Sequence, residues 1–269
     1  MKLNKTQELY LSFFYTIGFF FLISNLKNFM KYVWMDSFTP QWPASWISLQ
    51  WSGPSISMIY VVFCLLIIPA ILNPQNRLLR FLAFFAIFQD LSMIHHGGKI
   101  GHATHLLIYL SAILVLFDFN KPRNFNLFLA TARTLIIAIY TISGSWKLLA
   151  LLKNNDFSQI YAGLYRFLPE SLSSAYSVGE TNTLSLAHFF TEHPNLSSTI
   201  AACAIAVEFF SFLALIFTRI QFYIGFVILF FHISILFFLG INFSMHAILV
   251  FYIFVLAAKL EKVDFKNAD

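Results

Sequence analysis

Long apolar stretches, separated by short polar clusters, dominate the sequence. The first, from Leu9 to Leu26, carries no charge, and about 20 helical residues are enough to cross the hydrocarbon core of a bilayer. Lys27 and Lys31 follow it in place of a small-residue cleavage site, so we expect an uncleaved membrane anchor. Further apolar stretches lie at residues 55–73, 78–95, 103–119, 124–151, 196–218, 220–239 and 242–259. The pattern predicts an all-α, polytopic membrane bundle with about eight transmembrane helices.

The distribution of Lys and Arg predicts the orientation of this bundle, because cytoplasmic loops carry an excess of these residues. If the N-terminus is cytoplasmic, ten of the 17 Lys and Arg lie in cytoplasmic segments and five in external segments. The cytoplasmic ten are Lys2, Lys5, Arg77, Arg80, Lys121, Arg123, Arg219, Lys259, Lys262 and Lys266, and the external five are Lys27, Lys31, Lys99, Lys153 and Arg166. The other two, Arg133 and Lys147, lie within the fifth span. Both termini are therefore expected in the cytoplasm.

The amino-acid composition shows which partners the protein can have, nucleic acid or a lipid bilayer. Hydrophobic residues make up 59% of the chain and charged residues 11%, which leaves too little polar surface for a water-soluble globule. The net charge of +5 forms no basic stripe, so nucleic acid is excluded as a partner and the lipid bilayer is expected. Cys64 and Cys203 lie in apolar runs and indicate neither a disulfide framework nor a CxxC site.

The chain is predicted to be one membrane domain, residues 1–269, with a long external connection at about 152–195. Apolar residues recur in this connection at three- and four-residue intervals. They predict an amphipathic helix that rests on the outer leaflet or caps the bundle. These residues are Phe157, Ile160, Tyr161, Leu164 and Leu168.

Titratable side chains from several predicted spans share one depth. A charge inside the membrane costs roughly 2.5–3.5 kcal/mol on insertion scales, so each one needs a partner, a cavity or a function. Glu208 lies near mid-depth, and the common level of the others indicates a site that opens outward. Structural roles remain open: interfacial histidines need no function, Asp90 or Glu208 can pair with a cation, and Arg133 can snorkel. The residues in the outer half are Asp90, His95, His96, His102, His105, Lys147, His232 and His246.

Lys147 stands apart from the other charged residues. It follows Ser143-Gly144-Ser145, small residues that allow another helix or a ligand to approach closely. Trp146 and Leu148 flank it, and an apolar setting favours a neutral amine that can act as a base or nucleophile. The alternative is a lysine that snorkels to the outer surface.

The segment Tyr140-Thr-Ile-Ser-Gly-Ser-Trp-Lys147-Leu148 places an aromatic residue, a small residue and Gly before a Lys-Leu pair at a predicted helix end. His105 lies at the start of the preceding predicted helix, and Glu208 lies within Ala206-Val-Glu-Phe-Phe. Later segments come in the order Thr218-Arg219, Phe230-Phe231-His232 and Gly240-Ile241-Asn242-Phe243. In order and spacing, these segments resemble the vitamin K-dependent γ-carboxylase-like family, also called the HTTM domain, from about Asn73 to Ala258.

The resemblance implies a membrane enzyme that uses a reduced isoprenoid naphthoquinone, of the menaquinol or vitamin K hydroquinone type, with oxygen and carbon dioxide. By resemblance, Lys147 is the base that deprotonates the quinol and His105 acts in the carboxylation half of the reaction. His232 and Glu208 are supporting members of the catalytic set. The cofactor-binding residues expected are Gly144, Trp146, His102 and His246, and no metal is implied.

The resemblance also bears on the substrate and the location. Only eleven residues follow Ala258, so we expect the extramembrane recognition domain of the full-length carboxylase to be absent. A partner protein would then supply recognition of a secreted peptide substrate. Short members of the family are bacterial membrane proteins, and the expected location is the bacterial inner membrane, with the site facing outward.

Two other classes of function remain open at this point. His102 and His105, with His95 and His96 nearby, could ligate metal as in membrane di-iron oxygenases, although the histidine order differs from theirs. A non-catalytic immunity, transport or scaffold protein is the second alternative. Transport favours inverted repeats or broken helices, and the sequence suggests only a kink at Pro69.

Overall fold

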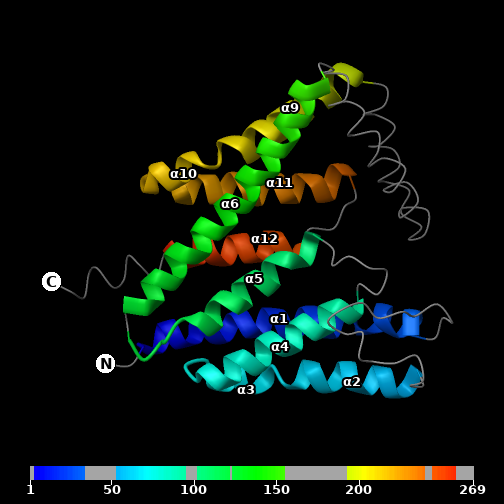
Figure 1. The fold of residues 1–269 in the computed structure, drawn as a ribbon, viewed down its shortest axis with the longest axis vertical. Helices are drawn as coiled ribbons and strands as arrows, with labels where there is room; N and C mark the ends of the chain where they lie inside the picture. Colours follow the sequence, from blue (N-terminus) through cyan, green and yellow to red (C-terminus); the bar gives the residue numbers. More distant parts are fainter. Residues whose placement is uncertain are drawn as a thin grey trace. The chain divides into compact units, whose positions relative to one another are not determined.

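The computed structural model describes residues 3–33, 53–94, 102–121, 123–154, 193–239 and 244–258, and in these residues it contains helices and no strand (Figure 1). Each of the eight apolar stretches of the sequence contains helix in its described residues. The prediction of an all-α fold is confirmed for this part of the chain. The expected amphipathic helix of the long connection falls on residues 155–192, and His95 and His96 also lie outside the described residues.

Three helical segments are long and apolar enough to cross a membrane: Lys5–Leu26, Pro54–Leu72 and Arg123–Lys153. Four shorter apolar helical segments accompany them, at Thr104–Leu116, Ala202–Ile216, Thr218–Ser234 and Ser244–Leu256. These helices support a membrane protein. Eight crossings and two cytoplasmic termini stay predictions.

The helices form two compact units that divide between Ala132 and Arg133. Unit 1 contains the described residues up to Ala132, and unit 2 contains those from Arg133 onward. The long helix α6 (Arg123–Asn154) continues through the division, with its first ten residues in unit 1.

Unit 1 is built around α1 (Lys5–Val33), which packs against α2 (Gly53–Leu65), α3 (Ile68–Leu72) and α4 (Arg77–Ile94). The next helix, α5 (His102–Leu116), packs against α4. Aromatic side chains fill the core, as where Phe29 of α1 stacks on Tyr60 of α2 with ring centroids 4.5 Å apart.

The second apolar stretch is divided into α2 and α3 by a turn at Leu66 and Ile67. The Leu66 N–H still donates to the Val62 oxygen at 3.0 Å, the Ile67 N–H donates three residues back to Cys64 at 3.2 Å, and Pro69 lies at the start of α3. Proline has no N–H to continue the helical ladder, and its ring crowds the preceding turn. The turn at Leu66 and Ile67 lies two residues before Pro69, where the sequence suggests a kink.

A buried arginine fastens the N-terminal turn of α4. Arg80 is fully buried, and its guanidinium donates to the backbone oxygens of Leu114 (2.9 Å) and Phe117 (2.6 Å) at the end of α5. It also donates to Pro74 (2.8 Å) and Gln75 (2.6 Å), which precede α4. The last carbonyls of a helix lack intrahelical partners and attract a cation, so Arg80 joins two helix ends. The orientation count treated Arg80 as a loop cation, whereas the structure shows an internal clamp.

The turn after α5 is closed locally. The backbone N–H of Asn120 donates to the Asp118 carboxylate at 3.1 Å, and this bond holds the pKa of that carboxyl below its usual value. The side-chain amide of Asn124 donates to the backbone oxygen of Asp118 at 2.7 Å. These hydrogen bonds connect the end of α5 to the first turn of α6.

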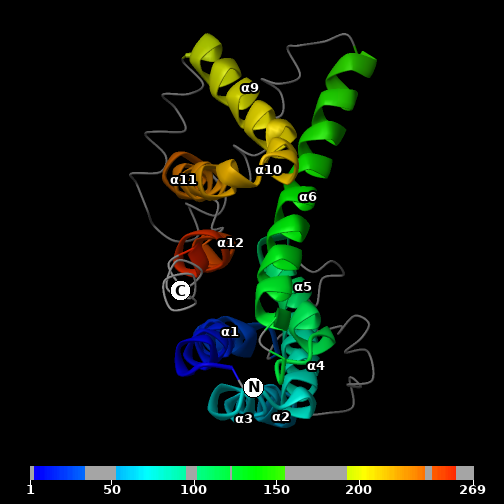
Figure 2. The same ribbon diagram turned by 90° about the vertical axis from the view of Figure 1, so that its left-hand side faces the viewer.

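Unit 2 contains the rest of α6 with α9 (Pro194–Phe210), α10 (Leu213–Ile216), the short 3₁₀ turn η2 (Thr218–Ile220), α11 (Gln221–Leu239), α12 (Ser244–Val250) and the π-helical segment η3 (Phe251–Leu256). In this unit α11 packs against α12 and η3, and α9 meets α6 near α10 (Figure 2). Arg133, for which the sequence suggested snorkelling, donates from Nε to the backbone oxygen of Ile253 at 3.3 Å. It therefore links α6 to η3.

Candidate functional site

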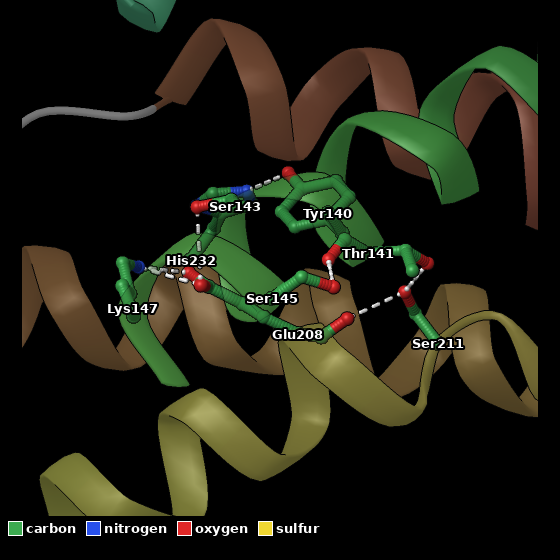
Figure 3. Close-up of polar contacts among 8 residues, drawn as sticks. All are labelled: Tyr140, Thr141, Ser143, Ser145, Lys147, Glu208, Ser211 and His232. Atoms are coloured by element: carbon green, nitrogen blue, oxygen red, sulfur yellow. Dashed lines mark hydrogen bonds and ion pairs between the residues drawn. The ribbon is translucent and has the colours of Figure 1, made fainter. Parts of the chain in front are cut away.

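Lys147 and Glu208 form an ion pair between α6 and α9. The Lys147 Nζ lies 2.7 Å from Oε1 and 2.5 Å from Oε2 of Glu208, so the ammonium donates to both carboxylate oxygens (Figure 3). The Glu208 side chain is 7% exposed and that of Lys147 is 47% exposed. The carboxylate is thus buried inside unit 2, and the ammonium that contacts it lies at the surface of the unit.

Gly144 makes this pairing possible. A Cβ added at Gly144 would overlap the backbone nitrogen of Phe209 and would lie 2.7 Å from its Cα and 2.8 Å from the carbonyl carbon of Glu208. Small residues let two helix backbones approach closely. The close approach that the sequence predicted from Ser143-Gly144-Ser145 is therefore made by the α9 backbone.

Two serine hydroxyls contact Glu208, one at the carboxylate and one at the backbone oxygen. Ser143 Oγ donates to Glu208 Oε2 at 3.2 Å, from the residue that precedes Gly144. Ser211 Oγ donates to the backbone oxygen of Glu208 at 2.7 Å and lies 2.9 Å from Thr141 Oγ1 (Figure 3). Residues three and four apart on a helix share a face, so one turn of α6 supplies both serine and lysine contacts to Glu208.

A second polar group lies on the same face of α6. The hydroxyl of Tyr140 is hydrogen-bonded to Nε2 of His232 on α11 (Figure 3). The His232 ring is 5.5 Å from the ring of His246 on α12, at an interplanar angle of 74°. Tyr140 precedes Lys147 by seven residues, which is about 10.5 Å along a helix. Unit 2 thus brings together four of the predicted residues and one tyrosine: Lys147, Glu208, His232, His246 and Tyr140.

The surroundings of Lys147 differ from those expected. The sequence placed it in an apolar setting, but its amine has a carboxylate partner contributed by a residue 61 positions later. An ammonium and a carboxylate in contact can exchange a proton with a third group, and they can stabilise an oxyanion that this group leaves behind. The Lys147–Glu208 pair therefore has the groups needed for acid–base chemistry at the surface of unit 2.

The other predicted residues are placed separately. Trp146 is 75% exposed beside Lys147 on α6, which leaves its indole ring open to a ligand or to lipid. His105 lies in unit 1, where its ring centroid is 5.9 Å from that of Tyr109 on the same helix. His102 is the first residue of α5, also in unit 1.

The sequence reading missed Tyr140, Ser143, Thr141 and Ser211 as individual contributors. Tyr140 and Ser143 precede Lys147 by seven and four residues, so a polar stripe along α6 was readable in advance. Ser211 gave no such signal, because its role depends on where α9 ends. In the residues that the structure describes, no group of three His, Cys, Asp or Glu side chains could hold a metal ion.

Comparison of the chain with protein-family models, curated proteins and solved structures finds no match.

Proposed function

We propose that the chain is a multi-pass membrane enzyme in which Lys147 and Glu208 form an acid–base pair that acts on a lipid-soluble hydroquinone. The observation that carries the proposal is the two-oxygen contact between Lys147 Nζ and Glu208, made with the carboxylate buried and the ammonium half-exposed. An ionisable pair inside a membrane protein is costly to place, and function is the usual reason for keeping one.

The donors and acceptors at the pair fit a hydroquinone. Glu208 offers a carboxylate that can accept a hydroxyl proton, and Lys147 offers a cation that can stabilise the oxygen left behind. Ser143 holds Oε2 in place by its hydrogen bond. Trp146, exposed on the adjacent position of α6, offers an aromatic face to a ring that reaches the pair from the lipid.

The order of the α6 motif and of Glu208 and His232 supports a chemistry similar to that of the vitamin K-dependent γ-carboxylase-like family. A reduced naphthoquinone bound at the pair would supply, with oxygen, the strong base needed for carboxylation with carbon dioxide. Lys147 and Glu208 would handle the quinol proton, while His105 would serve the carboxylation half. The proposed substrate is a secreted peptide, brought by a partner protein to the outer face of a bacterial inner membrane.

The experiment that tests this proposal is oxygen uptake by the purified chain supplied with a short-chain menaquinol. General acid–base groups contribute about 100-fold or more to a rate, so Lys147→Ala and Glu208→Gln should each lower uptake by about that factor. Lys153→Ala is the matched control, because Lys153 is an exposed lysine in the last turn of the same helix. This control should retain wild-type uptake.

Oxygen uptake that is unchanged in the two variants would contradict the proposal. Wild-type uptake in both Lys147→Ala and Glu208→Gln, with the proteins correctly inserted, would remove the pair from the chemistry. The ion pair would then be a structural contact between α6 and α9, and a binding or scaffold role would replace the enzyme.

A further inference from the structure

We infer that Asp90 and Cys64 form a second intramembrane site, one that binds a proton within unit 1. The site is separate from the proposed Lys147–Glu208 chemistry and does not depend on it. The Cys64 thiol of α2 donates to Oδ2 of Asp90 on α4, with Sγ and Oδ2 3.3 Å apart. Both residues are fully buried.

The second oxygen of Asp90 is the feature that requires a ligand. Asp90 Oδ1 is buried and has no hydrogen-bond partner in the structure. Within the described residues, no Lys, Arg or His nitrogen forms an ion pair with this carboxyl. A buried carboxylate without a counter-charge is strongly disfavoured, whereas the neutral acid needs no counter-charge. A proton on Oδ1 fits these surroundings, with the thiol donating to the other oxygen.

The same surroundings argue against a metal cation. Hard cations such as Na⁺, Mg²⁺ and Ca²⁺ require several oxygen ligands, and a thiol is a poor ligand for them. The titratable side chains that interact with Asp90 are Cys64 and Tyr60, both of α2. The Tyr60 hydroxyl is already committed, because it donates to the backbone oxygen of Leu22 on α1 at 2.7 Å.

The position of Cys64 allows the proton of the site to exchange with water. Cys64 is near the middle of the 19-residue span Pro54–Leu72, and its backbone oxygen accepts the i→i−3 bond of Ile67 (3.2 Å) at the turn between α2 and α3. Broken helices beside an intramembrane carboxyl are typical of proton and ion sites in transporters, because the interrupted backbone can rearrange. Movement of α3 relative to α2 would open a route for water to Asp90.

Infrared spectroscopy of the full chain in lipid nanodiscs tests this site without assuming an activity. Aspartate labelled with ¹³C at the side-chain carboxyl separates its acid carbonyl band from those of glutamate. At neutral pH we expect one labelled acid band in the wild type, shifted in D₂O, lost in Asp90→Asn and kept in Glu208→Gln. Absence of a labelled acid band in the wild type, which needs no variant, would overturn the proposal.

The S–H stretch supplies a second readout, because the chain has only two cysteines. Cys64→Ala should remove the band of a hydrogen-bonded thiol, and Asp90→Asn should shift it. Cys203→Ala, at an exposed cysteine in unit 2, is the matched control and should remove only the other band. Loss of the acid band on addition of NaCl at constant pH would assign the site to a cation and overturn the proton.

Discussion

Gly144 of α6 packs against the backbone of Phe209 of α9, and this contact brings Lys147 within reach of Glu208. The glycine lies three residues before the lysine, and Phe209 directly follows the glutamate. This close backbone approach and the ion pair therefore lie within one turn of each helix. The site depends on the spacing of two helices as much as on its charged groups.

Replacing this glycine should separate the two helices. In Gly144→Ala the added Cβ meets backbone atoms of Phe209 and Glu208, which cannot rotate away, so we expect a loss of stability of about 1–3 kcal/mol. Gly18→Ala is the matched control, because its Cβ would lie 3.6 Å from Ile87 and 3.7 Å from Leu107, at ordinary contact distances. Thermal unfolding in detergent measures both, and equal midpoints for the two variants would count against the close approach.

The two halves of the ion pair should respond unequally to mutation. Lys147→Met leaves the buried carboxylate of Glu208 without its counter-charge, at a cost of about 1–3 kcal/mol or more. Glu208→Gln leaves a half-exposed ammonium that can turn away, so its cost should be smaller. A double-mutant cycle by thermal unfolding measures the coupling. If the single variants add without coupling, the pair is not formed in the protein.

The buried guanidinium of Arg80 should not tolerate lysine. Arg80→Lys keeps the charge but cannot reach four backbone oxygens at once, so we expect a loss of about 3–5 kcal/mol. Arg77→Lys, at an exposed arginine that donates to the Val115 oxygen at 3.0 Å, should cost about 1 kcal/mol or less. Unfolding midpoints of the two variants compare them directly. A mild effect at Arg80 would show that the clamp contributes little.

The predicted orientation can be read from the turn between α5 and α6. Asn120 is exposed in this turn, and the excess of Lys and Arg places it in the cytoplasm. A cysteine introduced by Asn120→Cys, in a Cys203→Ser background that removes the exposed native thiol, should resist a membrane-impermeant thiol reagent in intact cells. It should react after the cells are opened. Labelling in intact cells would invert the orientation.

The helices were readable from the sequence because apolar length alone decides where a chain can form them in a membrane. Tertiary partners were not readable. The sequence predicts Arg80 only as a cytoplasmic cation, because nothing in it shows that the carbonyls of Pro74, Gln75, Leu114 and Phe117 converge on the guanidinium. Lys147 was expected in apolar surroundings because its carboxylate partner comes from a helix 61 positions later.

The predicted site was partly assembled by the structure. Lys147, His232 and His246 share a predicted depth, and Glu208 is predicted nearer mid-depth. In unit 2, Lys147 of α6 pairs with Glu208 of α9, and Tyr140 of α6 bonds to His232, whose ring lies beside that of His246. Ser211 escaped prediction because serine in an apolar helix is common and its hydrogen bonds depend on packing. His102 and His105 belong to unit 1, and their part in the site stays a prediction.

In the proposed function, Lys147 and Glu208 act on a bound hydroquinone. The most direct measurement is to purify the chain in mild detergent and quantify co-purifying isoprenoid quinone by mass spectrometry, with metals quantified by elemental analysis. We predict quinone close to one per chain without stoichiometric metal, lost in Lys147→Ala and retained in Lys153→Ala. Two metal ions per chain without quinone, or equal quinone in wild type and Lys147→Ala, would contradict a hydroquinone site at Lys147 and Glu208.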